Sequence, residues 1–262
     1  MAQSMKDVKA ITIPEGSVKK IEDSNGNIIW GSQVAFPYRI LEYIDIPPDA
    51  YLNLNSAGDS NLGLKLDINF NPLNVSTQQT SSNLFGSIYY NGSTYYRYHI
   101  STANTGLIQV WFGSGNGAYK DSALYSTDTN RHFIELNMRS PKDKKLYIDN
   151  VDKGTYTTPS TTQTGLVYLG ARIFNNNGTV TINNYPRTIR VYYCELAGPN
   201  YDTNPNDLSK LYPVQRKSDG AVGLLKIWNN GSAVRFCPSE TSTGCTAGAT
   251  VQEYFTGTEW PS

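Results

Sequence analysis

The stretch from Arg131 to Leu196 constrains the fold more than any other part of the chain, because it repeats short apolar runs separated by polar turns. Its first run, 133–138, alternates apolar and polar residues, which puts one face of a strand in a core and the other in water. Three further runs follow, at 146–149, 165–170 and 188–196. Strands joined by a hairpin and loops form a meander, so the sequence predicts an all-β, antiparallel β-sandwich.

Alternation of the same kind continues outside that stretch. Residues 62–70 alternate Leu, Ile and Phe with polar residues and give the clearest half-buried strand in the chain. Asn91-Gly92 lies between two apolar runs, and Asn-Gly in that position is a strong hairpin signal. One segment differs from these predicted strands: the sequence predicts a short helix at Asp207–Leu211, with Asp207 as its cap.

The composition excludes two classes of partner. The 262 residues carry zero net charge at a pI near 6.7, so no basic surface predicts a nucleic-acid partner. No apolar run approaches the ~18 residues needed to cross a membrane, and the amino terminus lacks the pattern of a secretory signal. The sequence therefore predicts neither nucleic-acid binding nor membrane insertion. The chain length fits either one large β domain with appendages or two domains.

The first 33 residues have a hairpin pattern of their own. Asp23-Ser24-Asn25-Gly26 lies between two apolar runs, and a hairpin this small is barely stable alone in water. It therefore needs a partner: its own domain, copies of itself or another protein. We divide the chain into an anchor segment (1–33), a β domain (34–236) and a C-terminal tail packed on that domain (237–262). The side chains expected to hold the anchor are Ile11, Ile13, Val18, Ile21, Ile28, Ile29 and Trp30.

The β domain resembles the laminin-G/concanavalin-A-like jelly roll. That family has a strand ending in an Asp turn, a strand ending in Leu-Gly, and a long aliphatic and tyrosine-rich strand. Leu146–Asp149, Leu169-Gly170 and Ile189–Leu196 match these features. His132 replaces a frequent Trp and Asn150 a frequent Gly, which a hairpin tolerates because Asn accepts a left-handed conformation. The resemblance implies a jelly-roll β-sandwich.

A second resemblance is more specific. Segment 13–32 (IPEGSVKKIEDSNGNIIWGS) is similar to the leader of virion proteins of tailed phages of gut Bacteroidales, including crAss-like phages. Segments 36–44 and 211–224 are similar to the entry strand and the closing motif of the jelly rolls in such proteins, although Leu225 and Lys226 replace a usual Tyr and Asp.

This resemblance implies a non-enzymatic structural protein of the virion, assembled in the host cytoplasm: a head fibre, a capsid decoration or a tail-associated adhesin. Its anchor would dock on other virion proteins by strand addition, and its copies would form a homo-oligomer, with a trimer as the first expectation. The displayed jelly roll would contact host or mucus glycans. The alternatives are a stand-alone carbohydrate-binding module and, on the same fold, a glycan-cleaving enzyme.

A search for catalytic residues yields no candidate. Glycanases of this fold carry carboxylates on alternate residues of one strand, whereas Asp67 and Glu135 are each alone on theirs and are interpreted as solvated. His99 and His132 lack a Glu-x-x-His neighbourhood and are interpreted as satisfied or surface histidines. A Ser-His-Asp set needs no adjacency in sequence, so the sequence leaves it open without supporting it.

Tyrosines around the Asn91-Gly92 turn are candidates for glycan contact, because an exposed tyrosine combines a broad apolar face with a polar tip. Ordinary strand tyrosines that cover the sheet are the competing interpretation. The candidates are Tyr89, Tyr90, Tyr95, Tyr96 and Tyr98.

Calcium is the one candidate ion, because domains of the resembled fold often carry it at the sandwich rim. Asp149 and Asp152 supply oxygen ligands of the right kind, but polar turns explain them more simply, and no other cofactor is expected. Cys237 and Cys245 could pair, although free thiols are favoured for a protein assembled in a reducing cytoplasm.

Overall fold

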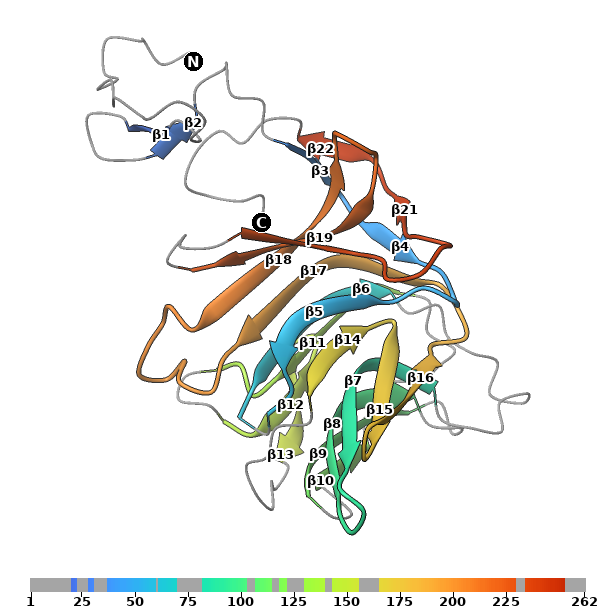
Figure 1. Cartoon of the computed structure of the whole chain (residues 1–262). Coiled ribbons are helices and arrows are strands. Elements are labelled where there is room, and N and C mark those ends of the chain that lie inside the picture. Colours follow the sequence, from blue (N-terminus) through green and yellow to red (C-terminus); the bar gives the residue numbers. More distant parts are fainter. Residues whose placement is uncertain are drawn as a thin grey trace.

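The computed structural model describes the following residues of the chain: 20–22, 28–30, 37–59, 61–69, 82–102, 107–114, 118–121, 130–139, 143–155, 165–229 and 234–252. Within these ranges the protein is all-β and contains no helix. Two large sheets of antiparallel and mixed pairing face each other (Figure 1), and a small two-stranded sheet is formed near the amino terminus.

The smaller of the two large sheets has eight described strands. Its main path is β10 (Ala118–Asp121), β9 (Ile108–Ser114), β8 (Tyr95–Thr102), β7 (Ser82–Tyr90), β14 (Leu166–Leu169) and β5 (Leu52–Ala57). β15 (Ala171–Asn176) pairs in parallel with β7 and antiparallel with β16 (Thr179–Asn184). That parallel pair makes the sheet mixed.

The larger sheet has twelve described strands. Its main path is β13 (Val151–Thr155), β12 (Lys145–Ile148), β11 (His132–Leu136), β6 (Gly63–Asn69), β17 (Ile189–Ala197), β18 (Leu208–Arg216), β19 (Val222–Trp228) and β20 (Val234–Pro238). Four short strands join it off this path: β3 (Tyr38–Leu41), β4 (Ile44–Ile46), β21 (Thr246–Ala247) and β22 (Thr250–Gln252).

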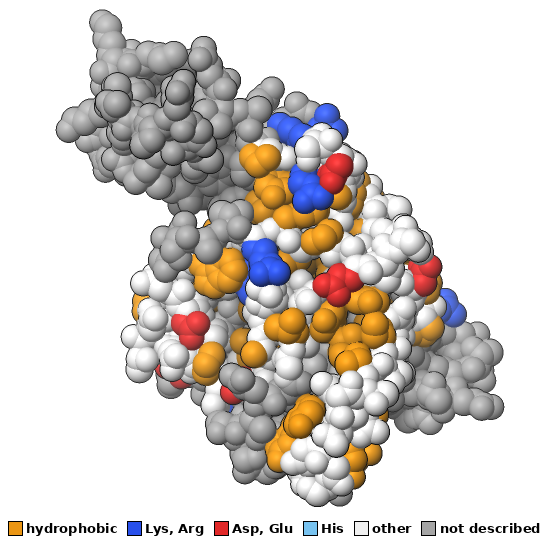
Figure 2. All heavy atoms as spheres, viewed as in Figure 1, with side chains coloured by type: hydrophobic (Ala, Val, Ile, Leu, Met, Phe, Trp, Pro, Cys, Tyr) orange, Lys and Arg blue, Asp and Glu red, His pale blue; other side chains and the backbone are white. Residues whose placement is uncertain are grey.

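One hydrophobic core lies between the two sheets, as the alternating pattern predicts. Leu64, Leu66 and Ile68 of β6 are fully buried, and from the opposite sheet Phe85 and Tyr98 belong to the same cluster. Because strand side chains alternate between faces, each sheet also has an outer face. Figure 2 shows hydrophobic side chains in patches among single charged groups on the visible face.

Lys226 connects the two sheets through the core. It lies on β19 of the larger sheet with 2% of its surface exposed. Its ammonium donates hydrogen bonds to the carbonyl oxygens of Leu54 (3.1 Å) and Asn55 (3.2 Å) and to Oγ of Ser56 (2.5 Å), all on β5. Burial lowers the pKa of Lys226 to about 8, which records the cost of removing the charge from water.

Both predicted turns that the structure describes are hairpins. The Asn91-Gly92 turn joins β7 to β8, and Oδ1 of Asn91 accepts hydrogen bonds from the backbone N–H groups of Ser93 (3.0 Å) and Thr94 (2.9 Å). Asp149 and Asn150 turn β12 into β13 with φ values of 52° and 65°. Asn150 therefore adopts the left-handed conformation expected of it.

The helix predicted at Asp207–Leu211 is wrong. From Leu208 onward these residues belong to β18, where β17 and β19 pair with its backbone on both sides. Asp207 instead accepts a hydrogen bond from the backbone N–H of Asn200 (2.9 Å) and closes the loop before the strand. The local capping signal is thus overridden by tertiary pairing.

The larger sheet forks between β17 and β18. β17 pairs with β4 at Ile189–Val191 and with β18 only from Cys194 onward, while β18 pairs with β3 from Val214. Pro213, which has no N–H to donate, lies between the segment of β18 that pairs with β17 and the segment that pairs with β3. The fork therefore accommodates a proline that an uninterrupted central strand would not.

The two ends of the chain are described in part. β1 (Lys20–Glu22) and β2 (Ile28–Trp30) pair antiparallel around the predicted turn, with Ile21 opposite Ile29. Ile11, Ile13 and Val18 of the predicted anchor lie outside the described residues. In the predicted tail, β21 pairs with β4 and β22 with β3, so its described part is joined to the β domain.

Candidate functional site

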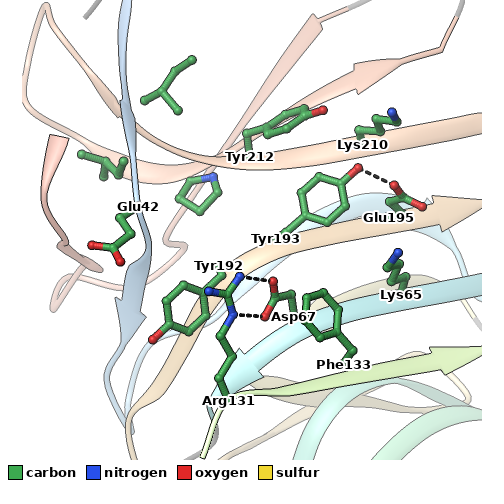
Figure 3. Close-up of a pocket in the computed structure, with 13 residues that line it drawn as sticks. Glu42, Lys65, Asp67, Arg131, Phe133, Tyr192, Tyr193, Glu195, Lys210 and Tyr212 are labelled. Atoms are coloured by element: carbon green, nitrogen blue, oxygen red, sulfur yellow. Dashed lines mark hydrogen bonds and ion pairs between the residues drawn. The ribbon is translucent and has the colours of Figure 1, made fainter. Parts of the chain in front are cut away.

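A cavity of about 580 Å³ lies on the outer face of the larger sheet, at the fork (Figure 3). β6 turns Leu64 and Leu66 into the core and Lys65 and Asp67 outward, and the neighbouring strands contribute outward residues in the same way. The described residues that line the cavity are Ile40, Leu41, Glu42, Lys65, Asp67, Arg131, Phe133, Tyr192, Tyr193, Glu195, Lys210, Tyr212 and Pro213.

A β-bulge brings two consecutive tyrosines into this cavity. Val191 lies opposite Ile68, but Tyr193 lies opposite Asp67, so Tyr192 is an extra residue on β17. Both Val191 and Cys194 remain in the core, and Tyr192 and Tyr193 between them line the cavity. Regular alternation would have sent one of the two tyrosines inward.

One wall of the cavity is an ion pair stacked on aromatic rings. Arg131 donates to both carboxylate oxygens of Asp67, with Nε 2.5 Å from Oδ1. Its guanidinium lies 4.0 Å from the ring centroid of Tyr192 and 5.7 Å from that of Phe133. The hydrogen bond to Asp67 raises the pKa of Arg131, so the guanidinium keeps its charge. Asp67 is only 2% exposed, and its interpretation as a solvated carboxylate is wrong.

The opposite wall holds hydroxyl and carboxylate groups. The Tyr193 hydroxyl donates to Oε1 of Glu195 at 2.5 Å, and the ring centroids of Tyr193 and Tyr212 are 5.2 Å apart. Burial and the adjacent Glu195 raise the pKa of Tyr193, and burial raises that of Tyr212 to about 12. Both phenols therefore keep their protons at neutral pH.

Lysines flank Glu195 on both sides. Lys65 of β6 and Lys210 of β18 are its cross-strand partners in the register, and Figure 3 shows all three side chains on one side of the cavity. Opposite charges on neighbouring strands attract one another. With Glu42, the described lining holds three carboxylates and three cations and is balanced in charge.

The tyrosines predicted for glycan contact divide between the two faces of the smaller sheet. Tyr90 and Tyr95 are paired and stacked with ring centroids 4.5 Å apart, and Tyr95 is 40% exposed. Tyr89 and Tyr96 are stacked at 6.0 Å and half-buried. Tyr98 does not fit the prediction, because it is fully buried in the core, where its hydroxyl donates to the Leu62 carbonyl (3.3 Å).

The candidate calcium ligands contact protein groups. One carboxylate oxygen of Asp149 accepts from the Phe133 N–H (2.8 Å), and the other lies 2.7 Å from Nδ1 of His132. Asp152 accepts from Nζ of Lys145 (2.6 Å) and from the Gly154 N–H (2.7 Å). Within the described ranges, no three His, Cys, Asp or Glu side chains are grouped to hold a metal ion. Calcium at Asp149 and Asp152 stays a prediction.

Two other residues differ from their interpretation. Glu135 is half-buried, with its carboxylate 3.9 Å from Nε of Arg139, rather than solvated. His99 is 3% exposed, and its Nδ1 has no hydrogen-bond partner, so it is neither satisfied nor on the surface.

Sequence reasoning missed the cavity because its members lie far apart in the chain. Asp67 and Arg131 are 64 residues apart, and Lys210 comes from a segment interpreted as helix. One signal was present: the three-residue spacing from Val191 to Cys194 breaks the period of two and marks a bulge.

Comparison with known proteins adds no relative. No protein-family model, no curated protein and no solved structure matches the chain. In the described part of the chain, no helix is long and apolar enough to span a membrane.

Proposed function

We propose that the β domain is a jelly roll of the laminin-G/concanavalin-A type that binds a neutral saccharide in the cavity at the fork, without cleaving it. The observation that carries this proposal is the cavity lining: aromatic rings beside charge-balanced hydrogen-bonding groups. The apolar face of a sugar ring packs on an aromatic ring, and its hydroxyls donate and accept hydrogen bonds at once.

Individual groups fit these two needs. Tyr192 and Phe133 provide ring surface, and Arg131 is held against them by Asp67. Glu195 offers an acceptor beside the Tyr193 hydroxyl. Because the lining carries equal numbers of positive and negative groups, it favours a neutral ligand over a charged one.

The test is a glycan array followed by calorimetry with the best neutral oligosaccharide. Tyr192→Ala should weaken binding at least about fivefold, since stacking of one ring contributes roughly 1–3 kcal/mol. Tyr168→Ala is the matched control, because Tyr168 lies on β14 of the smaller sheet and does not line the cavity at the fork. Equal loss in both variants, or no binding above background by the wild type, would contradict the proposal.

We further propose that the protein is a structural component of a tailed-phage virion, a head fibre, capsid decoration or tail-associated adhesin. Residues 1–33 would dock on other virion proteins and the sandwich would be displayed, in a homo-oligomer with a trimer as first expectation. Support comes from the phage-like segments 13–32, 36–44 and 211–224 and from the separate β1–β2 sheet. Mass spectrometry of purified particles tests this, because absence of the protein from them would exclude a virion role.

Glycan cleavage is the alternative that a specific observation favours. Glu42, Asp67 and Glu195 all line the cavity, and paired carboxylates are the groups that hydrolyse glycosidic bonds. Binding is preferred because Asp67 is held by Arg131 on both oxygens and Glu195 accepts from Tyr193. New reducing ends from a host polysaccharide, lost in Glu195→Gln, would establish the enzyme instead. A stand-alone carbohydrate-binding module would bind the same sugar and be absent from particles.

A further inference from the structure

A second cavity, of about 340 Å³, lies on the outer face of the smaller sheet. The described residues that line it are Ile88, Tyr95, Arg97, His99, Trp111, Arg172 and Phe174, from β7, β8, β9 and β15. Gly113 of β9 lies opposite Arg97 in the register and has no side chain to occupy this face.

The charge of this cavity is one-sided. Its described lining includes two arginines and a histidine but no Asp or Glu, in contrast to the balanced cavity on the other sheet. Burial and the neighbouring Arg97 lower the pKa of Arg172, and burial with both arginines lowers that of His99 well below its usual value. The positive charge of the two arginines therefore lies where water is partly excluded, and a bound anion would offset the cost of that burial.

Two buried polar atoms in this lining have no partner. Nε of Arg172 is buried and makes no hydrogen bond, and the same is true of Nδ1 of His99, whose ring is 3% exposed and stacked on Trp111 at 6.0 Å. Buried polar groups in proteins are hydrogen-bonded with few exceptions, so the unsatisfied Nε–H of Arg172, with the unpaired Nδ1 of His99 in the same lining, indicates a ligand that completes them. A guanidinium matches the two oxygens of a carboxylate or sulfate.

Aromatic rings adjoin these cations. Arg97 lies 5.0 Å from the ring centroid of Tyr95 and 5.3 Å from that of Trp111. Tyr95 is stacked on Phe174 at 6.2 Å and on Tyr90 at 4.5 Å, so a row of three rings extends from the cavity toward the Asn91-Gly92 turn. Such a row gives an apolar surface of ring edges beside the cations, against which the apolar face of a sugar ring can pack.

We propose that this cavity is a second binding site, specific for an acidic saccharide, with Arg172 and Arg97 holding a uronate carboxylate or a sulfate ester and Tyr95 and Trp111 contacting the sugar ring. This proposal rests on the proposed glycan-binding function. It gives the smaller sheet an acidic ligand, whereas the cavity on the larger sheet takes a neutral one. Two of the tyrosines singled out from sequence, Tyr90 and Tyr95, then belong to this site.

The experiment is calorimetry with four probes: a polygalacturonate tetramer, a sulfated heparin tetrasaccharide, an uncharged tetrasaccharide and sodium sulfate. The wild type is compared with Arg172→Gln, Arg172→Lys and Arg235→Gln, the last removing an exposed arginine of β20 on the other sheet. Thermal unfolding verifies that each variant is folded. An acidic tetrasaccharide should bind at least about tenfold more weakly to Arg172→Gln than to the wild type. Its affinity should be partly restored in Arg172→Lys and unchanged in Arg235→Gln.

Any other result with the acidic tetrasaccharides overturns the proposal. Equal weakening by Arg172→Gln and Arg235→Gln would mean unspecific charge attraction, and sulfate binding as tightly as the tetrasaccharides would mean a simple anion site. Failure here is distinct from failure of the proposed function. If only the uncharged sugar binds, and Tyr192→Ala abolishes that binding, the acidic site alone is wrong. If acidic sugars bind through Arg172 while uncharged ones do not bind at all, the cavity at the fork is wrong.

Discussion

Replacing Lys226 by methionine should change how stability depends on pH. The side chain spans the core with three hydrogen bonds to β5, and methionine keeps its approximate volume without its charge or its donors. Hydrogen bonds from a charged donor contribute roughly 1.5–3 kcal/mol each, and the burial of the charge opposes them. At pH 7 we expect Lys226→Met to lower the free energy of unfolding by about 1–3 kcal/mol.

The sign of the pH dependence follows from the lowered pKa. Lys226 has a pKa of about 8 in the folded protein against 10.5 in the unfolded chain. Between these values the unfolded state binds the proton and the folded state does not, so this residue adds stability as pH rises from 8 to 10.5. At about 1.4 kcal/mol per pH unit, that interval amounts to about 3 kcal/mol.

Urea unfolding of both proteins from pH 6.5 to 10.5 measures this effect. Tyrosines and cysteines with raised pKa destabilise both proteins at high pH, and subtracting the variant removes most of that contribution. The difference in unfolding free energy between wild type and Lys226→Met should be constant below pH 7.5 and grow by up to about 3 kcal/mol by pH 10.5. A difference that stays constant over the whole range would refute the reasoning.

Three further predictions concern the fold. Gly86→Ala should cost about 3 kcal/mol or more of unfolding free energy, because a Cβ there would lie 2.1 Å from a backbone oxygen at φ 125°. Gly92→Ala should cost only about 1 kcal/mol, from backbone strain at its φ of 95°, because its Cβ meets nothing within 4 Å; equal midpoints in urea would contradict this. Cys194 and Cys237 are unpaired and buried, so a thiol reagent should label them only on unfolding, and rapid labelling of native protein would disagree. Asp67→Asn should lower the unfolding free energy by about 1–2 kcal/mol in a denaturant titration. The loss is small because Arg131 is half-exposed and water can replace part of its bond to Asp67; no loss at all would argue against the ion pair.

Sequence patterns predicted the parts of the fold that local chemistry decides. The period-two alternation at 62–70 became β6, and Asn91-Gly92 and Asn150 lie in hairpin turns because their backbone preferences are local. The helix at Asp207–Leu211 was mispredicted because two neighbouring strands, distant in sequence, determine the structure of Leu208 and Leu211.

The sites depended on register, which no local pattern specifies. Tyr192 reaches the cavity at the fork through a bulge, and Arg131 reaches Asp67 only because β11 pairs with β6. Tyr98 was mispredicted as a glycan contact because alternation alone does not say which face of β8 is inward. His99 and Arg172 come together only through the separate pairing of β7 with β8 and with β15.

The most direct test of glycan binding through the outer faces is a titration of ¹⁵N-labelled protein, monitored by its amide chemical shifts. The uncharged oligosaccharide selected on the array is added to the full chain, and shifts are mapped on the structure. The shifts should gather at the fork of the larger sheet, in β17, β18 and the Arg131–Phe133 segment, and disappear in Tyr192→Ala. Shifts confined to other surfaces, or none at saturating sugar, would contradict this expectation.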